Sequence, residues 1–304
     1  MTVSLLIYYI LSLFYDSLKV DMRFVGFCIG ASIIAIMGFL DDFKDLRAIE
    51  KMIFQVVAAS VVYLFGVGIL GVKIPFIYNN IIDFGIFAYP ITVIWILGIT
   101  NAVNLIDGLD GLAAGISTIS AISLLAVFLL SGAPLEAVII TIALVGAALG
   151  FLPYNFNPAK TFMGDVGSNF LGFTLAVISI MGMAKGYTVL AIVAPIIILG
   201  IPVFDMIFAI IRRLLRGQKI TAPDKEHIHH RLLNLGLSQR QAVLTLYVIT
   251  SVLGVIAVAL TANMKWQIIL VIVIVANIIT IYAVTKYKHK KEDEKLELNE
   301  KSEV

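Results

Sequence analysis

Long apolar stretches separated by short polar segments run through almost the whole chain. A membrane-spanning helix needs about 20 mostly apolar residues, with about 17 as the practical minimum. Nine stretches reach this length, and a tenth, at the N-terminus, is shorter but lacks the basic region and cleavage site of a signal peptide. The predicted spans lie at approximately 2–15, 24–40, 52–72, 86–103, 112–131, 135–152, 166–183, 188–211, 241–260 and 267–285.

This pattern predicts an all-α fold, a polytopic membrane bundle of about ten transmembrane helices. It leaves one sizeable loop, at 212–240. We expect residues 1–285 to form a single transmembrane domain and residues 286–304, in which Lys and Glu alternate, to form a charged cytoplasmic tail.

Composition narrows the class of protein further. Hydrophobic residues make up 60% of the 304 positions and charged residues 14%, against roughly 25% charged in soluble domains, which excludes a soluble globular protein. The single cysteine, Cys28, excludes a disulfide scaffold. A net charge of +2 gives no support for a nucleic-acid partner.

The basic residues predict an orientation. When ten spans are threaded alternately, 17 of the 22 Lys and Arg residues fall on one side of the membrane. Cytoplasmic loops carry the excess of Lys and Arg, so this side is predicted to be cytoplasmic, and Met1 then also starts there.

Polar residues gather on the same predicted side, which indicates one site. A transporter would instead place polar groups near the bilayer midplane, and only Asp205 is partly submerged, about 9 Å from the end of its span at 1.5 Å per residue. The group comprises Asp41, Asp42, Asn101, Asn104, Asp107, Asp110, Asn155, Asn157, Lys160, Asp165, Asp205, His227, His229, His230 and Arg231.

These residue types favour phosphoryl transfer. Mg²⁺ prefers oxygen ligands and is commonly held by one or two carboxylates plus substrate phosphates, so the aspartates and asparagines predict Mg²⁺, with Mn²⁺ as a substitute. Zinc is less favoured, because the histidines are tightly bunched and no HExxH is present. Histidines and arginines above such a site suit the negative charge of the transition state. We expect a water-soluble phosphate compound to be joined to a lipid.

Two segments add a geometric reason. In 162–168, Gly164 permits close backbone approach and Asp165 precedes a long apolar helix whose first N–H groups favour phosphate. In 101–111, Gly108 and Gly111 are predicted to break a helix, so that Asp107 and Asp110 turn outward.

Five segments in order closely resemble the polyprenyl-phosphate N-acetylhexosamine-1-phosphate transferases (glycosyltransferase family 4), over about residues 24–285. They are 38–42 (GFLDD), 101–115 (NAVNLIDGLDGLAAG), 155–160 (NFNPAK), 162–165 (FMGD) and 223–232 (PDKEHIHHRL). The His-Ile-His-His-Arg form is similar to the WecA/TagO branch. The sister MraY branch, which uses UDP-MurNAc-pentapeptide, has a more uniform histidine run and is the alternative.

The resemblance implies an activity and a location. GlcNAc-1-phosphate would pass from UDP-GlcNAc to undecaprenyl phosphate with release of UMP, as the first membrane step of teichoic acid or another cell-envelope polysaccharide. The protein would lie in the bacterial cytoplasmic membrane with its active site on the cytoplasmic face. A homodimer is possible in this family.

The resemblance also implies residue roles. Asp165 would be the principal Mg²⁺ ligand, with Asn104 as a second. Asp41 or Asp42 would contact the metal or the lipid phosphate, and Asp107 would join them in catalysis. His227, His229, His230 and Arg231 would neutralise the diphosphate or position the sugar. The positions matched to substrate binding, with Phe162 stacking on uracil, are Asn101, Leu109, Asp110, Asn155, Lys160, Phe162 and Asp205.

Other interpretations exist for single residues and for the whole chain. A paired Asp at a helix end is usually a solvated cap, Phe162 alone would more often be packing, and Asp205 could have Arg212 as a structural partner. A non-catalytic transporter or a scaffold protein would bind without turnover, so UMP release separates the classes. CDP-alcohol enzymes need a DGxxAR-type element, which is absent from the sequence.

Family members ordinarily have eleven spans, with a basic Gly-Gly loop before the helix that begins here at Met1. The ten predicted spans and the predicted cytoplasmic Met1 imply that this first span and loop are missing from the chain as written. We expect that chain to be weakly active and poorly stable, and in-frame upstream codons that encode the segment to raise activity at least about tenfold.

Overall fold

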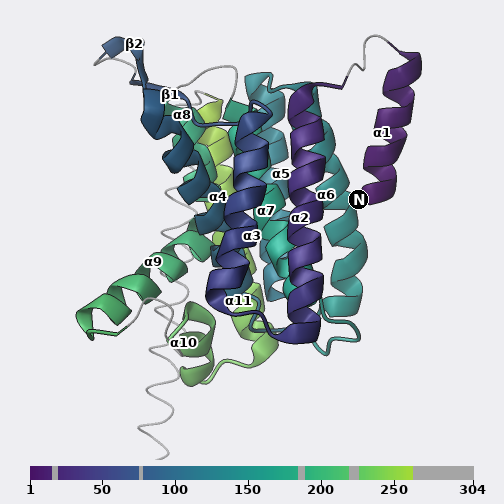
Figure 1. The fold of residues 1–304 in the computed structure, drawn as a ribbon. Helices are drawn as coiled ribbons and strands as arrows, with labels where there is room; N and C mark the ends of the chain where they lie inside the picture. Colours follow the sequence, from purple (N-terminus) through teal and green to yellow (C-terminus); the bar gives the residue numbers. More distant parts are fainter. Residues whose placement is uncertain (16–19, 75–77, 184–188, 219–225, 263–304) are drawn as a thin grey trace, which may run out of the picture.

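The computed structural model describes residues 1–15, 20–74, 78–183, 189–218 and 226–262, and these form a helical bundle (Figure 1). Its elements are α1 (Thr2–Phe14), α2 (Met22–Lys44), α3 (Ala48–Leu64), β1 (Gly71–Ile74), β2 (Tyr78–Asp83), the 3₁₀ turn η2 (Gly85–Phe87), α4 (Ala88–Leu105), α5 (Leu112–Ser131), α6 (Leu135–Asn155), α7 (Gly164–Met183), α8 (Val189–Ile198), α9 (Gly200–Leu215), α10 (Ile228–Asn234) and α11 (Gln239–Thr261).

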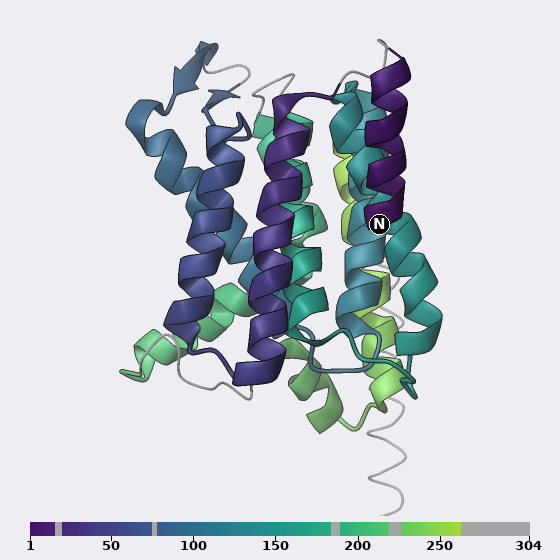
Figure 2. The same ribbon diagram turned by 45° about the vertical axis from the view of Figure 1, so that its right-hand side comes forward.

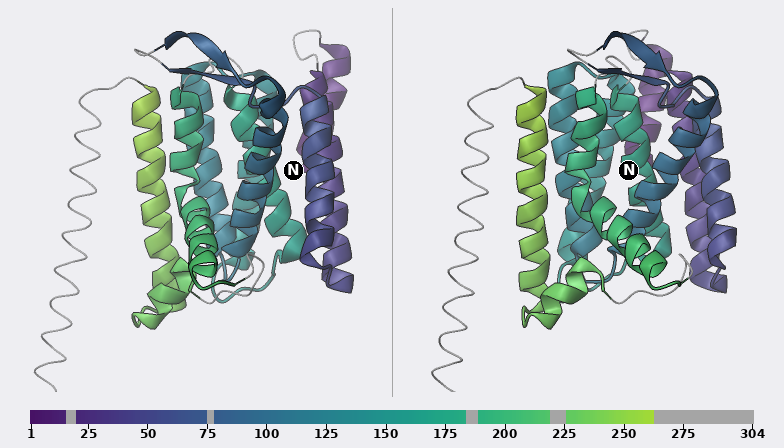
Figure 3. Two further views of the ribbon diagram at one scale, coloured as in Figure 1. Left: turned by 60° about the vertical axis from the view of Figure 1, so that its left-hand side comes forward. Right: turned by 90° about the vertical axis from the view of Figure 1, so that its left-hand side faces the viewer.

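The bundle has two distinct ends. The strands β1 and β2 lie at one end, which we call the hairpin end, and α10 lies at the other, which we call the polar end (Figures 1 and 2). Helices α2, α4 and α6 run from the hairpin end to the polar end, and α3, α5, α7 and α11 run back (Figures 1 and 3). This alternation brings the C-terminal ends of α2 and α4 beside the N-terminal end of α7.

Helix α7 forms the centre of the core. Its residues Phe173, Leu175 and Ile178 are fully buried, and the Phe173 ring stacks on Phe27 of α2 with centroids 6.5 Å apart. The two helices touch backbone to backbone at Gly38, where a Cβ atom would lie 2.4 Å from the Cα atom of Val166. Glycine at this position therefore sets how close the end of α2 comes to the start of α7.

The expected all-α membrane bundle is confirmed, but the count of about ten spans is not. In the described ranges, six helices are long and apolar enough to cross a membrane, or seven if a bent pair counts as one span. Helix α3 has 17 residues, which is the practical minimum for a span. Helix α1 has 13 residues and is about 20 Å long, so it is shorter than a hydrocarbon core of about 30 Å. The predicted span 267–285 and the predicted tail 286–304 lie outside the described residues.

Two predicted spans have different bounds in the structure. The stretch 52–72 is helical only to Leu64, because Gly66 adopts φ +91° and the chain then enters an antiparallel hairpin that pairs Gly71 with Asp83. A glycine at positive φ ends the helix at little steric cost. The sequence analysis did not predict this hairpin.

The stretch 188–211 is broken rather than continuous. Helices α8 and α9 meet at an angle of 82°, with Pro195 inside α8 and Pro202 in the first turn of α9. Proline removes a backbone donor and clashes with the preceding turn, so a sharp bend is expected here. The predicted loop 212–240 is shorter than expected, because α9 extends to Leu215 and α10 and the start of α11 lie within it.

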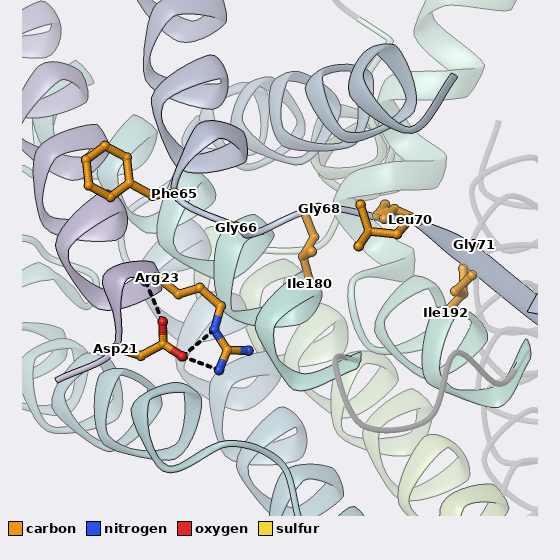
Figure 4. A pocket seen from close by; sticks show the side chains of 10 residues that line it. Asp21, Arg23, Phe65, Gly66, Gly68, Leu70, Gly71, Ile180 and Ile192 are labelled. Carbon is orange, nitrogen blue, oxygen red and sulfur yellow. Dashed lines mark hydrogen bonds and ion pairs between the residues drawn. The ribbon is translucent and has the colours of Figure 1, made fainter. Parts of the chain in front are cut away.

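A cavity of about 310 Å³ lies near the hairpin end (Figure 4). Asp21 and Arg23 line it, and Arg23 Nε donates to Asp21 Oδ2 at 2.9 Å. Phe65, Ile180 and Ile192 form its apolar walls. None of the residues that the sequence analysis assigned to the site lines this cavity.

The two ends give a labelling prediction. Cysteines placed at Asn79 in β2 and at Ala262 after α11 should react with an impermeant reagent from one side of the membrane, and a cysteine at Gly217 after α9 from the other. Cys28 must first be replaced, since it is the only native cysteine. Reaction of Gly217→Cys and Asn79→Cys from the same side would contradict this threading.

Candidate active site

An acidic cluster lies at the polar end between α2, α3 and α7. Asp41 is in the last turn of α2, where its side chain is 3% exposed, and Asp165 is in the first turn of α7. The Lys51 ammonium of α3 contacts Asp41 Oδ2 and lies 3.2 Å from Asp165 Oδ2. Two carboxylates from different helices therefore converge on one cation.

Asp42 joins the cluster through the backbone of the FMGD segment. Its Oδ1 atom accepts a hydrogen bond of 3.1 Å from the Asp165 backbone N–H. Gly164 is at φ +61°, and a Cβ atom there would lie 2.8 Å from Asp42 Oδ2. The glycine is needed for its conformation and for the space that Asp42 occupies.

Asparagine and glutamine side chains connect α4 to this cluster. Asn104 Nδ2 donates to Asp165 Oδ1 at 2.6 Å and to Ser168 Oγ at 2.8 Å. Asn101 Nδ2 donates to Gln55 Oε1 at 2.8 Å, and Gln55 Nε2 donates to Asn169 Oδ1 at 3.2 Å. Asn101 therefore lies in a layer of amides that ties α3, α4 and α7 together.

The sequence analysis missed Lys51 and Gln55. It used Lys51 only as one of the basic residues that set the orientation, and it began the next span at residue 52. The two side chains are four residues apart, so they share one face of α3. A polar pair with this spacing at the start of an apolar helix was the available signal.

The turn between α4 and α5 holds Asp107. The chain leaves α4 at Leu105 and enters α5 at Leu112, with Gly111 at φ +80°, so the predicted helix break is confirmed. Burial, reinforced by the negative charge of the Asp165 carboxylate, raises the pKa of Asp107 to about 6.

This raised pKa makes a stability prediction for the metal-free protein. The folded state binds the Asp107 proton more tightly than the unfolded state, so wild type loses stability as pH rises through about 4 to 6. Asp107→Asn carries no charge and should avoid a cost of about 3 kcal/mol. We expect its apparent melting temperature in EDTA to match wild type near pH 4 and to exceed it by a few degrees at pH 8. An equal difference at both pH values would contradict the assignment.

Asp110 and Asn155 hold the loop between α6 and α7. Asp110 Oδ2 accepts from Asn157 Nδ2 at 2.9 Å and from the Ala159 N–H at 3.1 Å. Asn155, which is 3% exposed, accepts from the Gly111 N–H at 3.1 Å and donates to the Thr161 carbonyl at 3.0 Å. These contacts fix the loop that carries Lys160 and Phe162.

The other residues matched to nucleotide binding differ in exposure. Phe162 is 74% exposed and Lys160 is also exposed, so both side chains are accessible to a ligand. Leu109 is half-buried and packs against a small apolar cluster under the α4–α5 turn.

The histidine segment begins at the N-cap of α10. His227 Nδ1 lies 2.8 Å from Asp205 Oδ2, and the Ile228 N–H donates to Asp205 Oδ1 at 2.9 Å. The rings of His227 and His229 stack with centroids 5.8 Å apart, and His230 is 4.3 Å from His229. Residues 223–225 of this motif lie outside the described residues.

His229 brings this segment to the α4–α5 turn. A Cβ atom on Gly108 would lie 2.6 Å from His229 Nε2, so the imidazole packs directly on the glycine. Asn104, four residues before Gly108 in the chain, contacts Asp165. The segment 104–108 therefore contacts the acidic cluster at one end and the histidine segment at the other. Burial, reinforced by the neighbouring His230 and His227, lowers the pKa of His229 to about 4. His229 is therefore neutral near pH 7.

Asp205 has a different position from the one expected. It is on α9, after the bend, rather than within a straight span, and both of its carboxylate oxygens contact the start of α10. Its partner is His227, while Arg212 lies 3.8 Å from Glu226. Through these contacts, Asp205 holds the histidine segment against α9.

The donor set fits a hard divalent cation better than zinc. Among the described residues, no three His, Cys, Asp or Glu side chains form a cluster that could hold a metal. Asp41 and Asp165 nevertheless point their oxygens at one ammonium, which marks a position suited to positive charge. Two carboxylates completed by substrate phosphates and water match Mg²⁺ coordination.

Comparison with known proteins identifies the family. Residues 24–183 match the model of glycosyl transferase family 4, which covers more than half of the chain. The matched range runs from the first turn of α2 to the end of α7 and includes the whole acidic cluster. The chain belongs to this family of membrane transferases.

Three curated relatives agree with this assignment. The chain is 42% identical over 263 residues to a probable undecaprenyl-phosphate N-acetylglucosaminyl 1-phosphate transferase of Bacillus subtilis, covering 86% of this chain and 73% of the relative. It is 34% identical to a decaprenyl-phosphate N-acetylglucosaminephosphotransferase of Mycolicibacterium smegmatis, covering 72% and 59%. It is 35% identical to a phospho-N-acetylmuramoyl-pentapeptide-transferase of Halalkalibacterium halodurans, covering 84% and 78%.

Proposed function

We propose that this protein transfers GlcNAc-1-phosphate from UDP-GlcNAc to undecaprenyl phosphate and releases UMP. The observation that supports this most is the convergence of Asp41 and Asp165 on Lys51, with Asn104 hydrogen-bonded to Asp165. The similarity to the Bacillus subtilis relative over most of both chains supports the donor and the lipid acceptor.

The reaction needs little covalent chemistry from the protein. An oxygen of the lipid phosphate attacks the phosphorus next to the sugar, the bond from that phosphorus to the bridging oxygen breaks, and UMP leaves with that oxygen. A phosphate monoester has its second pKa at about 6 and is largely ionised near neutral pH, so no base is needed to generate the nucleophile. The protein must hold two anions close together and stabilise the charge between them.

The residues of the cluster can supply that stabilisation. Asp41 and Asp165 would hold Mg²⁺, with Asn104 beside them, and the ion would stabilise the negative charge of the phosphates. Lys51 would contact phosphate oxygens once the ion balances the two carboxylates. Asp42 fixes the backbone at Asp165 through its Oδ1 atom. Its Oδ2 atom and the acceptor phosphate are both negatively charged, so a contact between them would need a proton on the phosphate or a metal ion between the two groups.

The histidine segment would mainly position the donor, because not every imidazole ring carries a positive charge that could balance the diphosphate. His229 is neutral near pH 7, so it can form hydrogen bonds but carries no charge there. Arg231, with 58% of its side chain exposed, is a cation of this segment that can approach the diphosphate. His227 would help to position the segment through its contact with Asp205. His230, which packs against His229, would contact the donor from the outer side of the histidine rings.

We place the polar end of the bundle on the cytoplasmic side of the bacterial cytoplasmic membrane. The excess of Lys and Arg at this end supports the orientation. A UDP-sugar is made in the cytoplasm, so a site on this side meets its soluble donor directly.

One assay tests the proposal and its alternative. Purified protein with undecaprenyl phosphate and Mg²⁺ receives UDP-GlcNAc, UDP-GalNAc or UDP-MurNAc-pentapeptide separately, and UMP is measured. We expect UMP with UDP-GlcNAc and its loss in EDTA. Turnover only with the pentapeptide donor would favour the function of the Halalkalibacterium halodurans relative, and binding without UMP would indicate a non-catalytic protein.

The exposed Phe162 ring gives a specificity prediction. If it stacks on uracil, Phe162→Ala should raise the KM for UDP-GlcNAc by about 5- to 150-fold, since stacking is worth about 1–3 kcal/mol per base, and should leave the lipid KM unchanged. Phe14→Ala is a matched control, because that ring is 77% exposed near the hairpin end. A rise in the lipid KM alone would place Phe162 at the acceptor instead.

Asp110 calls for a different expectation. Because its carboxylate holds Asn157 and Ala159, Asp110→Ala should disturb the loop as well as the donor site. Its effect on donor KM is therefore weaker evidence for a uracil contact than that of Phe162.

A further inference from the structure

Helix α11 contacts the turn between α4 and α5 through one tyrosine. Tyr247 Oη donates to the Gly111 carbonyl at 2.5 Å, while the Gly111 N–H donates to Asn155 Oδ1 at 3.1 Å. Gly115 packs on the same tyrosine ring, because a Cβ atom there would lie 1.9 Å from Tyr247 Cζ. The last two glycines of the motif at 101–115 therefore both contact Tyr247, and the backbone of Gly111 is held from both α6 and α11.

The first residues of α11 contact the loop between α6 and α7. Asn157 Nδ2 donates to Gln239 Oε1 and to Asp110 Oδ2, both at 2.9 Å, so one amide joins α11 to the α4–α5 turn. Arg240 Nε donates to the Asn157 carbonyl at 2.9 Å. The side chain and the backbone of Asn157 are thus both attached to α11.

An apolar cluster packs under these hydrogen bonds. Val243 and Leu246 of α11 are fully buried in one cluster with Leu112 of α5, and Phe156 and Met163 at the two ends of the α6–α7 loop pack against it. Apolar contacts of this kind stabilise the segments but leave their exact positions less strictly defined, whereas hydrogen bonds have a preferred distance and direction. We therefore expect the polar contacts of α11 to fix where the turn and the loop lie.

Both segments border the acidic cluster. The α4–α5 turn follows Asn104, which donates to Asp165, and the α6–α7 loop leads directly to Asp165 in the first turn of α7. The loop presents the exposed ring of Phe162 three residues before Asp165, within the length of a nucleotide whose phosphates are held at that carboxylate. A small displacement of the loop would move the ring relative to the phosphate site, and binding depends on such positioning.

We propose that Tyr247 and Gln239 are positioning residues for the nucleotide of the donor. They hold the α4–α5 turn and the α6–α7 loop in place relative to Asp165, and they act on the ligand through these two segments. The identity of the nucleotide, a uridine phosphate, rests on the proposed function. Helix α11 lies outside residues 24–183, so the part of the chain beyond the family match contributes to the donor site.

The positioning can be measured without any turnover. Hydrogen–deuterium exchange of the full chain in detergent micelles compares wild type with Tyr247→Phe and Gln239→Leu. We expect peptides that cover 106–112 to exchange at least about fivefold faster in Tyr247→Phe, and peptides that cover 156–163 to do so in Gln239→Leu, because each variant loses one of the hydrogen bonds that hold the segment. Wild-type exchange of both segments in both variants would overturn the proposal.

Binding of radiolabelled UMP and of radiolabelled UDP-GlcNAc is then measured for the same variants. Tyr247→Phe and Gln239→Leu should each raise both Kd values by the same factor, at least about fivefold, because the nucleotide is common to the two ligands. Fivefold corresponds to about 1 kcal/mol, the size of one hydrogen bond. The kcat at saturating donor and the KM for undecaprenyl phosphate should stay within threefold of wild type.

Two control variants separate positioning from general stability. Tyr89→Phe also removes one tyrosine hydroxyl, which lies 2.9 Å from Ser60 Oγ near the hairpin end. Gln241→Leu removes the hydrogen bond of 2.9 Å from the Ser238 N–H to Gln241 Oε1, so it weakens the cap of α11 but leaves the contact between Gln239 and the α6–α7 loop. We expect both controls to bind UMP within twofold of wild type.

The outcomes separate this inference from the proposed function. Wild-type Kd values in both variants would overturn the inference, and so would a rise in the Kd for UDP-GlcNAc alone, because the effect would then concern the sugar. An equal rise in Gln241→Leu would also overturn it, because the effect would then come from the stability of α11. UMP binding by wild type without UMP release from any donor would instead refute the proposed function, while the exchange and UMP-binding measurements would still test Tyr247 and Gln239.

Discussion

Asp165→Asn is expected to lower kcat by at least about 10³-fold while the protein stays folded. The Asp165 carboxylate accepts from Asn104 and contacts Lys51, and the Asp165 backbone N–H donates to Asp42, so three other helices meet at this residue. Asparagine has the same shape but lacks the charge that a bound cation requires. Metal-borne stabilisation in such sites amounts to several kcal/mol, and each 1.4 kcal/mol is about tenfold in rate.

The chain offers a matched control in the same region. Asp45 is exposed after α2 at φ 48°, a conformation that asparagine tolerates well. Asp45→Asn removes one carboxylate near the cluster and should leave kcat within about twofold of wild type. Near-normal turnover of Asp165→Asn at saturating Mg²⁺ would exclude Asp165 from the metal shell.

Lys51→Met should lower kcat by about 10²- to 10³-fold, the range seen when one preorganised electrostatic group is removed from a site. Methionine keeps much of the apolar stem, so the effect should come from the lost ammonium. Without it, the Asp41 and Asp165 carboxylates face each other with no compensating charge in the metal-free protein. We therefore also expect the variant to need Mg²⁺ for full thermal stability, more than wild type does.

Lys44→Met is the corresponding control, because Lys44 is exposed in the last turn of α2. Rate measurements across a Mg²⁺ titration and melting curves with and without EDTA check both parts. Equal kcat for Lys51→Met and wild type would show that Lys51 has no role in turnover. Its role would then be limited to balancing the two carboxylates in the metal-free protein.

Motif spacing located much of the site before the fold was known. The two glycines after Asn104 predicted the break between α4 and α5, and the polar residues at span ends predicted a single polar end. Alternate threading of apolar helices forces residues at every second connection to one side, so this inference needed no tertiary information. The sequence could not give the contact that Asp205 makes: Arg212 was one alternative, and the bend between α8 and α9 brings Asp205 to His227.

The sequence by itself determined that this is a membrane bundle, which family it belongs to and which end holds its polar chemistry, since hydropathy and motif order are local properties of the chain. Tertiary structure alone decided which side chains meet. Lys51 lies between Asp41 and Asp165 because the contact at Gly38 draws α2 against α7 while α3 returns beside them. The His229 ring packs against the α4–α5 turn because Gly108 in that turn has no side chain. The contacts of Lys51 with Asp165, of Gly38 with Val166 and of Gly108 with His229 join residues more than 100 positions apart. Their distances depend on packing across helices that no local pattern encodes.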